Sequence, residues 1–183
     1  MRLTVASLAE RIDEAAPGYE VDGLQEFRAK VHRRRARTRK IYHPATIFDH
    51  YAFHDGGRTE LQYNVGLESE DGKRWWRHGV AFSFERSQTL PDPSRLVPKV
   101  IRFNAWLRAN PSVLKGFKLS SWDEANGWSG ERPLAEIPDR WMEDGFFIFI
   151  GKRWTESDLD VDKILRDFDR VYPVYRFVES GRK

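Results

Sequence analysis

A block of cations near the N-terminus is the part of this sequence best suited to chemistry. From Phe27 to Phe48 there is no acidic residue, while eight Lys and Arg side chains occur there. The most crowded of them are Arg33, Arg34, Arg35, Arg37, Arg39 and Lys40. Polyanion binding requires several cations within reach of successive phosphates, and this block meets that requirement. The alternative interpretation is a solvated helix end, because cations also favour a helix C-terminus.

A second basic group is predicted on a helix. Pro91 to Ser94 breaks the chain and opens a helix in which Leu96, Val100, Phe103 and Leu107 recur at helical spacing and face the core. Another face of this helix carries a stripe of cations, which is a second candidate for phosphate contact: Arg95, Lys99 and Arg102.

Aromatic residues beside polar and basic ones are candidates for contact with a base. Trp75 and Trp76 are adjacent on a predicted strand, so one faces the core and the other faces outward. Trp122 and Trp128 lie in a loop rich in Gly, Ser and Asn, whose Asp and Asn side chains are able to read a base edge. An outward indole flanked by Arg can stack a base or hold a flipped one. The alternatives are a Trp that covers the end of a sheet, and an ordinary surface loop.

A row of polar side chains alternates with apolar ones on a predicted strand. Leu61, Tyr63, Val65 and Leu67 are typical of a half-buried strand, and the residues between them include Glu60, Gln62 and Asn64. These three polar side chains are expected on one face, where they suit hydrogen-bonded recognition of a base edge or plain exposure to water.

The elements around these residues predict an α+β fold. Strands are expected at 47–53, 60–67 and 75–84, joined by turn residues into an antiparallel meander, and an apolar run at 146–150 predicts a central strand covered on both faces. A last helix with Val161, Ile164, Leu165 and Phe168 inward is followed by a predicted strand or packed tail from Tyr172. Because hairpins rather than helical crossovers join the strands, we predict a mostly antiparallel, curled or barrel-like sheet with flanking helices.

The whole chain limits the classes of function. It has 183 residues, a net charge of +3 and no Cys, which excludes a disulfide scaffold, a thiolate zinc site and a cysteine nucleophile. We expect N-terminal helices with the basic segment at 1–40, packed on a main α+β domain at 41–183. No apolar run has the length of a membrane span and no leader pattern is present, so the sequence predicts a cytoplasmic protein without a membrane partner.

Several strings resemble an N-terminal domain that precedes HNH-type modules in modification-dependent bacterial restriction endonucleases. They are residues 59–66, 77–91, 98–104 and 145–152, within a likeness that covers 45–178. The resemblance implies a DNA specificity module that recognises an unmodified or a modified base and delivers a nuclease module of the same or another chain. A nuclease motif itself is missing from this sequence.

The sequence therefore predicts a DNA-binding domain without catalytic residues, metal or cofactor. Two other classes remain open. One is a small metal-dependent nuclease that uses Asp49, Glu60 and a histidine. The other is a protein-interaction module, favoured by the acidic side chains of the last predicted helix: Glu156, Asp158, Asp160, Asp162, Asp167 and Asp169.

Overall fold

The computed structural model describes Arg11 and residues 51–55, 59–70, 73–88, 90–155 and 157–180. The basic block at 33–40, Asp49 and the two predicted N-terminal helices (apart from Arg11) lie outside the described residues, as does nearly all of the predicted 1–40 segment.

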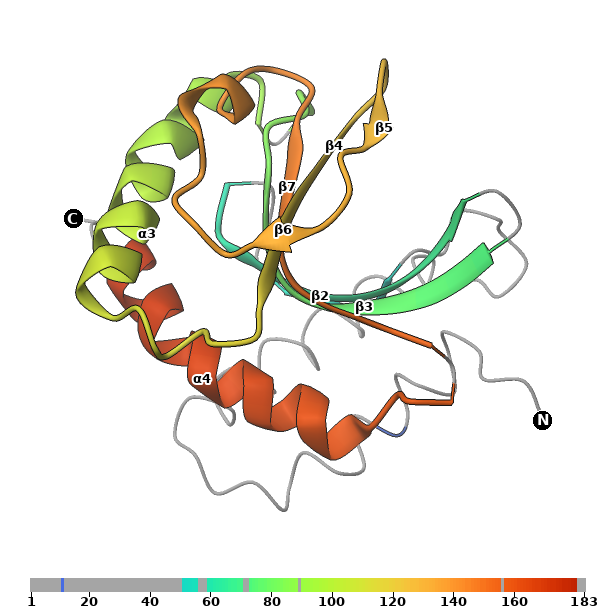
Figure 1. The fold of residues 1–183 in the computed structure, drawn as a ribbon. Helices are drawn as coiled ribbons and strands as arrows, with labels where there is room; N and C mark the ends of the chain where they lie inside the picture. The colour runs from blue at the N-terminus through green and yellow to red at the C-terminus, as the bar shows by residue number, and fades with distance from the viewer. Residues whose placement is uncertain are drawn as a thin grey trace. The chain divides into compact units, whose positions relative to one another are not determined.

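The sheet is mostly antiparallel and is flanked by helices, so the predicted α+β class is confirmed (Figure 1). Its strand order is β1-β2-β3-β7-β4-β5, with β6 paired to β4, and β1 and β5 end the path, so the described strands do not close into a barrel. The predicted meander is present as β1, β2 and β3 in consecutive order. The strand bounds are Tyr51–Asp55 for β1, Gln62–Glu70 for β2, Lys73–Ser83 for β3, Lys118–Asp123 for β4, Gly127–Trp128 for β5, Arg132–Pro133 for β6 and Phe147–Trp154 for β7.

The helix after the proline-rich break is confirmed. A 3-10 turn η2 (Pro93–Leu96) leads into α3 (Val97–Ala109), and the Asp92 carboxylate accepts a hydrogen bond from the Ser94 amide at 3.1 Å. This bond satisfies one of the amides that a helix start leaves without a partner. A second 3-10 turn, η3 (Asp139–Trp141), follows Pro138.

The last helix is longer than predicted. α4 runs over Val161–Glu179 with Pro173 inside it, whereas the sequence predicted a strand or tail from Tyr172. The predicted inward residues of its first half are buried, and Val171, Val174, Tyr175 and Val178 continue the same helical spacing into the core. Burial of this second set outweighs the roughly 3 kcal/mol that an interior proline costs a helix.

The chain divides into two compact units, which are described separately. Of the described residues, unit 1 comprises Arg11, 51–55, 63–78 and 153–169, and unit 2 comprises 59–62, 79–152 and 170–180, with the gaps given above. Strands β2, β3 and β7 and helix α4 each contribute residues to both units.

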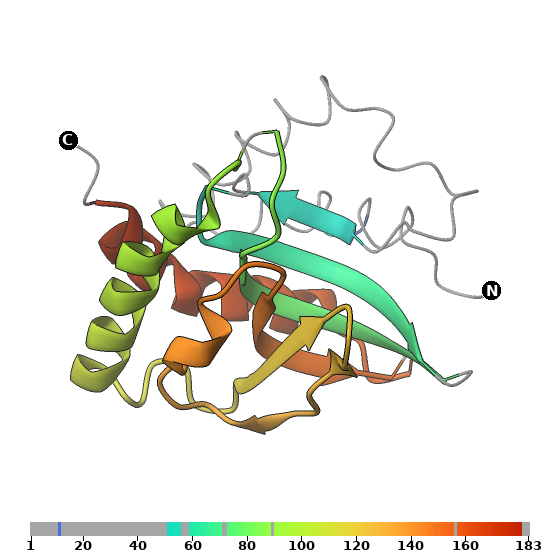
Figure 2. The same ribbon diagram turned by 90° about the horizontal axis from the view of Figure 1, so that it is seen from above.

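Unit 2 has a tightly packed apolar core. Phe82 of β3 and Phe103 of α3 meet edge to face with ring centroids 5.9 Å apart. β7 is buried from Phe147 to Gly151, which confirms a central strand covered on both faces. The strands approach so closely at Gly79 that an added Cβ would lie 2.2 Å from the Ile150 carbonyl oxygen. The β4–β5 hairpin lies at the end of the strand path, with β6 on β4 (Figures 1 and 2).

Candidate nucleic-acid interface

Unit 2 contains a pocket of about 390 Å³ at the C-terminal end of α3. The helix ends because Pro111 cannot continue it, and the Asn110 amide bonds back to the carbonyls of Trp106 and Leu107. The turn that follows leads into β4, where Lys118 is paired with Pro133 of β6. The pocket is lined by Leu107, Arg108, Pro111, Leu114, Lys115, Gly116, Phe117, Lys118, Pro133, Leu134, Ala135 and Glu136.

The charged side chains of this pocket are mostly positive. Arg108, Lys115 and Lys118 are exposed residues of its lining, and Glu136 is the one acidic residue of the lining. Glu136 is already paired with Arg108 at 2.5 Å. Lys115 and Lys118 form no ion pair with any residue in the described ranges. The lining therefore has positive charge to offer a ligand.

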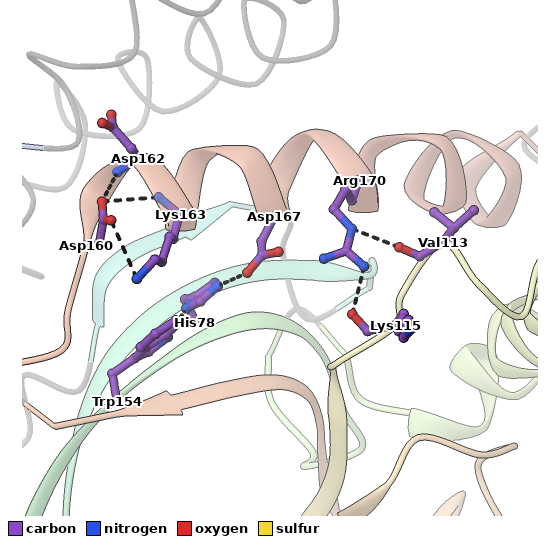
Figure 3. A network of polar contacts seen from close by, with 9 residues as sticks. All are labelled: His78, Val113, Lys115, Trp154, Asp160, Asp162, Lys163, Asp167 and Arg170. Atoms are coloured by element: carbon purple, nitrogen blue, oxygen red, sulfur yellow. Dashed lines mark hydrogen bonds and ion pairs between the residues drawn. The ribbon is translucent and has the colours of Figure 1, made fainter.

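Two further cations lie against the buried ring of Phe117, a residue of the pocket lining. Lys152 Nζ is 5.2 Å and Arg170 Cζ is 5.4 Å from the ring centroid, within the range of cation–π contact. Arg170 also donates to the carbonyls of Val113 at 2.9 Å and of Lys115 at 2.8 Å (Figure 3). It thereby fixes the turn that carries Lys115 and adds positive potential at the pocket.

The two tryptophans predicted in a loop form an aromatic face on the β4–β5 hairpin. Trp122 and Trp128 are register partners, and both are half-buried against a cluster of Ala81, Phe147 and Phe149. Trp128 meets Phe147 edge to face at 6.1 Å. Part of each indole thus remains able to contact a ligand.

The polar residues of this hairpin turn are engaged locally. The Asp123 carboxylate accepts hydrogen bonds from the Ala125 amide at 3.0 Å and from the Asn126 amide and side chain, each at 2.9 Å. These bonds fix the turn that holds Trp122 opposite Trp128.

Of the adjacent Trp pair in unit 1, Trp76 is a core residue with 1% of its surface exposed, so it is not available to a ligand. Trp75 is half-buried, and the Arg153 guanidinium lies 5.0 Å from its ring centroid. The Nε1 atom of Trp75 is buried without a hydrogen-bond partner among the described residues. Trp75 is therefore the member of the pair that reaches the surface.

The polar row on β2 is not exposed as a row. Gln62 is 2% and Asn64 0% exposed, and Glu60 is half-buried. In unit 1, Asn64 Oδ1 accepts a hydrogen bond from the buried Arg77, whose Nε also bonds Glu68 at 2.6 Å. The alternating pattern predicted that one face of β2 is buried. Side chains on both faces are buried, and the polar side chains of the second face form hydrogen bonds with other buried or half-buried side chains. Gln62 and Asn64 are thus removed from the set of base-edge readers.

The second basic group is only partly available. Arg95 is exposed, but Lys99 is buried and donates to the Thr59 carbonyl at 2.7 Å and to Glu179. Arg102 is half-buried and donates to the Val178 carbonyl at 2.8 Å. The predicted stripe of three phosphate-binding cations is therefore reduced to Arg95, because the other two hold the C-terminal end of α4.

Unit 1 contains a buried polar cluster that the sequence did not predict. His78 is 0% exposed, with Nε2 2.8 Å from an Asp167 carboxylate oxygen (Figure 3). Trp154 Nε1 donates to His78 Nδ1 at 2.6 Å. Because an indole N–H can only donate, Nδ1 carries the lone pair and the imidazole proton sits on Nε2, directed at Asp167. The cluster is closed to a substrate, and we interpret it as structural.

No group of three or more His, Asp or Glu side chains that could hold a metal ion occurs within the described ranges. In the same part of the chain, no helix is long and apolar enough to cross a membrane.

The sequence did not predict the residues around the pocket as site residues. The one local signal was the spacing Lys115-Gly116-Phe117-Lys118, two cations that flank a turn and an aromatic residue. Lys152 and Arg170 lie too far along the chain for any spacing to connect them with it. In comparisons with known proteins, no family model, no curated protein and no solved structure matches the chain.

Proposed function

We propose that this chain binds DNA, as a specificity domain of a restriction or other defence system. The observation that carries the DNA-binding part is the pair of exposed cations Lys115 and Lys118 at the pocket of unit 2, where the single acid of the lining is already paired with Arg108. Phosphate contacts supply most of the affinity in protein–DNA complexes, and exposed cations without acidic partners are what such contacts need. The restriction-system part is supported by the resemblance of sequence motifs described above.

In this proposal Lys115, Lys118 and Arg95 hold phosphates, with the N-terminal block at 33–40 as a further phosphate surface. Trp128 and Trp122 are the base-contacting residues, with Trp75 as a third. Stacking on an aromatic ring tolerates every base, whereas an altered base is distinguished by the fit of its substituent against the ring and its neighbours.

The test of the phosphate contacts is a charge reversal. The double variant Lys115→Glu/Lys118→Glu is expected to weaken binding to every duplex and to lower the slope of log K against log salt by about 0.9 for each phosphate that is no longer neutralised. The matched control, Arg140→Glu/Arg166→Glu, changes the same charge at exposed cations that are not among the lining residues and is expected to change binding little. Equal effects of the two double variants would contradict the proposed surface.

The N-terminal block is tested separately. Reversal of Arg33 and Arg35 to Glu is expected to produce a further uniform loss of affinity. Unchanged affinity would remove the block from the proposal without affecting the pocket cations.

Base contact is tested with a panel of plain, methylated, hydroxymethylated and phosphorothioate duplexes at two salt concentrations. Trp128→Ala is expected to lower affinity by about tenfold or more, since stacking contributes roughly 1–3 kcal/mol per base. Trp128→Phe, which keeps a ring, is expected to retain most of the affinity. A change in preference among the duplexes would identify the indole as a specificity residue, and no change in any of them would contradict its role.

A further inference from the structure

The pocket at the end of α3 has the features of a small-ligand site as well as of a phosphate surface. Its volume of about 390 Å³ lies in the range of small-molecule sites, roughly 300–1,000 Å³. Its apolar wall is built from Leu107, Pro111, Leu114, Pro133 and Leu134. Such a wall suits a flat, uncharged ring and offers little to a phosphate backbone.

The lining combines these apolar side chains with cations. Lys115 and Lys118 are exposed members of the lining, and Lys152 and Arg170 lie against the ring of Phe117, which is another member. Arg108 forms an ion pair with Glu136. An anionic ligand that binds Arg108 therefore has to compete with the Glu136 carboxylate. A lining that combines apolar side chains with exposed cations is complementary to a ligand that joins a ring to an anionic group.

We propose that this pocket binds a nucleotide, with the base against the apolar wall and the phosphate monoester between Lys115 and Lys118. Two kinds of molecule carry such a nucleotide: a free nucleoside monophosphate, and a DNA strand with an unpaired, 5′-phosphorylated end. The site shares both lysines with the proposed DNA surface, but binding of the free nucleotide does not depend on binding of a duplex.

The free-nucleotide arm measures binding of the four deoxynucleoside 5′-monophosphates by calorimetry, with inorganic phosphate and the nucleosides as partial ligands. A monophosphate is expected to bind at least tenfold more tightly than either partial ligand, and amide shifts are expected to cluster at 107–118 and 133–136. The DNA arm compares a duplex that has a 5′-phosphorylated overhang with a blunt, unphosphorylated duplex. Preference for the overhang assigns the site to DNA ends, and equal binding of the two duplexes assigns it to free nucleotides.

Three variants test the geometry. Lys118→Ala is expected to weaken nucleotide binding by about tenfold, in line with a charge-assisted hydrogen bond. Glu136→Gln is expected to tighten it severalfold, because the variant frees Arg108 and removes the only acid of the lining. Lys73→Ala, a change at an exposed cation of unit 1, is the control and is expected to have no effect.

The inference is overturned if the monophosphate binds no better than inorganic phosphate, or if Lys118→Ala and Lys73→Ala behave alike. Either result leaves the DNA proposal standing, provided that the lysine charge reversals still weaken duplex binding. Conversely, nucleotide binding without any duplex binding would support the pocket and contradict the proposed function. All three substitutions change exposed residues, where the fold tolerates replacement at a cost of about 0.5 kcal/mol or less.

Discussion

Both units of this protein concentrate charged and polar side chains, yet they use them differently. In unit 1, His78, Asp167 and Trp154 satisfy one another within the core, as do Arg77, Asn64 and Glu68. In unit 2, Lys115 and Lys118 stand exposed at a pocket, with no acidic partner in the described ranges. The contrast shows that the polar clusters of unit 1 are neutralised within the fold. What distinguishes the proposed site in unit 2 is charge that the fold leaves available.

The largest effect is expected where β3 leaves unit 1 for unit 2. Gly79→Ala would place a Cβ 2.2 Å from the Ile150 carbonyl oxygen, so the two strands would have to separate. We expect a loss of about 3 kcal/mol or more in the free energy of unfolding, measured by urea denaturation. Gly130→Ala is the control, because Gly130 has a φ of +74° with no atom within 4 Å, and it is expected to cost only about 1 kcal/mol. Equal costs would show that conformation, not close packing, requires glycine at 79.

The second prediction concerns the closed cluster of unit 1. Asp167→Ala leaves the buried His78 Nε2–H without its acceptor and is expected to cost about 2–3 kcal/mol of stability. Asp167→Asn keeps an oxygen that can accept and is expected to cost less. Under conditions in which the variants are fully folded, neither change should alter the affinity for nucleotide or DNA. A change in affinity under these conditions would contradict the structural role.

The third prediction concerns the support of the pocket in unit 2. Arg170→Met removes the two hydrogen bonds to Val113 and Lys115 while it keeps the apolar stem. We expect a stability loss of about 1–2 kcal/mol together with weaker nucleotide binding, since the turn that carries Lys115 is no longer fixed. Arg166→Met, at an exposed position of the same helix, is the comparison. Loss of stability with unchanged nucleotide binding would show that the position of this turn does not affect the pocket.

The smallest effect is expected from a partly buried carboxylate of unit 1. Burial raises the pKa of Asp169, and its Oδ1 atom has no hydrogen-bond partner within the described ranges. A raised pKa in the folded state means that the charged form is disfavoured by folding, so the penalty exists above that pKa and vanishes below the ordinary carboxyl value. Asp169→Asn should therefore be slightly more stable than the parent at pH 7.

The advantage of Asp169→Asn should disappear as the pH falls below about 4, the ordinary range of an aspartate. Thermal unfolding at a series of pH values measures this difference. A variant that is less stable at neutral pH would show that Asp169 makes a favourable contact instead.

The sequence predicted much of the fold because the signals were local. Alternation predicted β2, helical spacing predicted α3 and the first half of α4, and a continuous apolar run predicted β7. The prediction failed at Pro173, where burial of Val174 and Val178 outweighs the local cost of proline. It also failed at Gln62 and Asn64, because an alternating pattern predicts that the apolar face of a strand is buried but does not show whether the polar face is buried too.

Less of the candidate site was predictable. The tryptophans of the β4–β5 hairpin were identified from their loop composition, but the exposure of Trp75 over Trp76 was left open. Lys99 and Arg102 were predicted as surface cations, although Glu179 and the Val178 carbonyl hold them at the end of α4. The partners that decide each of these outcomes lie far along the chain.

By itself, the sequence determined the α+β class, the strand meander and the inward faces of the helices, because these depend on spacings of two to four residues. The tertiary structure alone decided which charges are neutralised and which are available. Arg170 reaches a carbonyl 55 residues away, and Lys99 reaches a carboxylate 80 residues away. Availability of charge depends on such distant partners, and no local spacing records them.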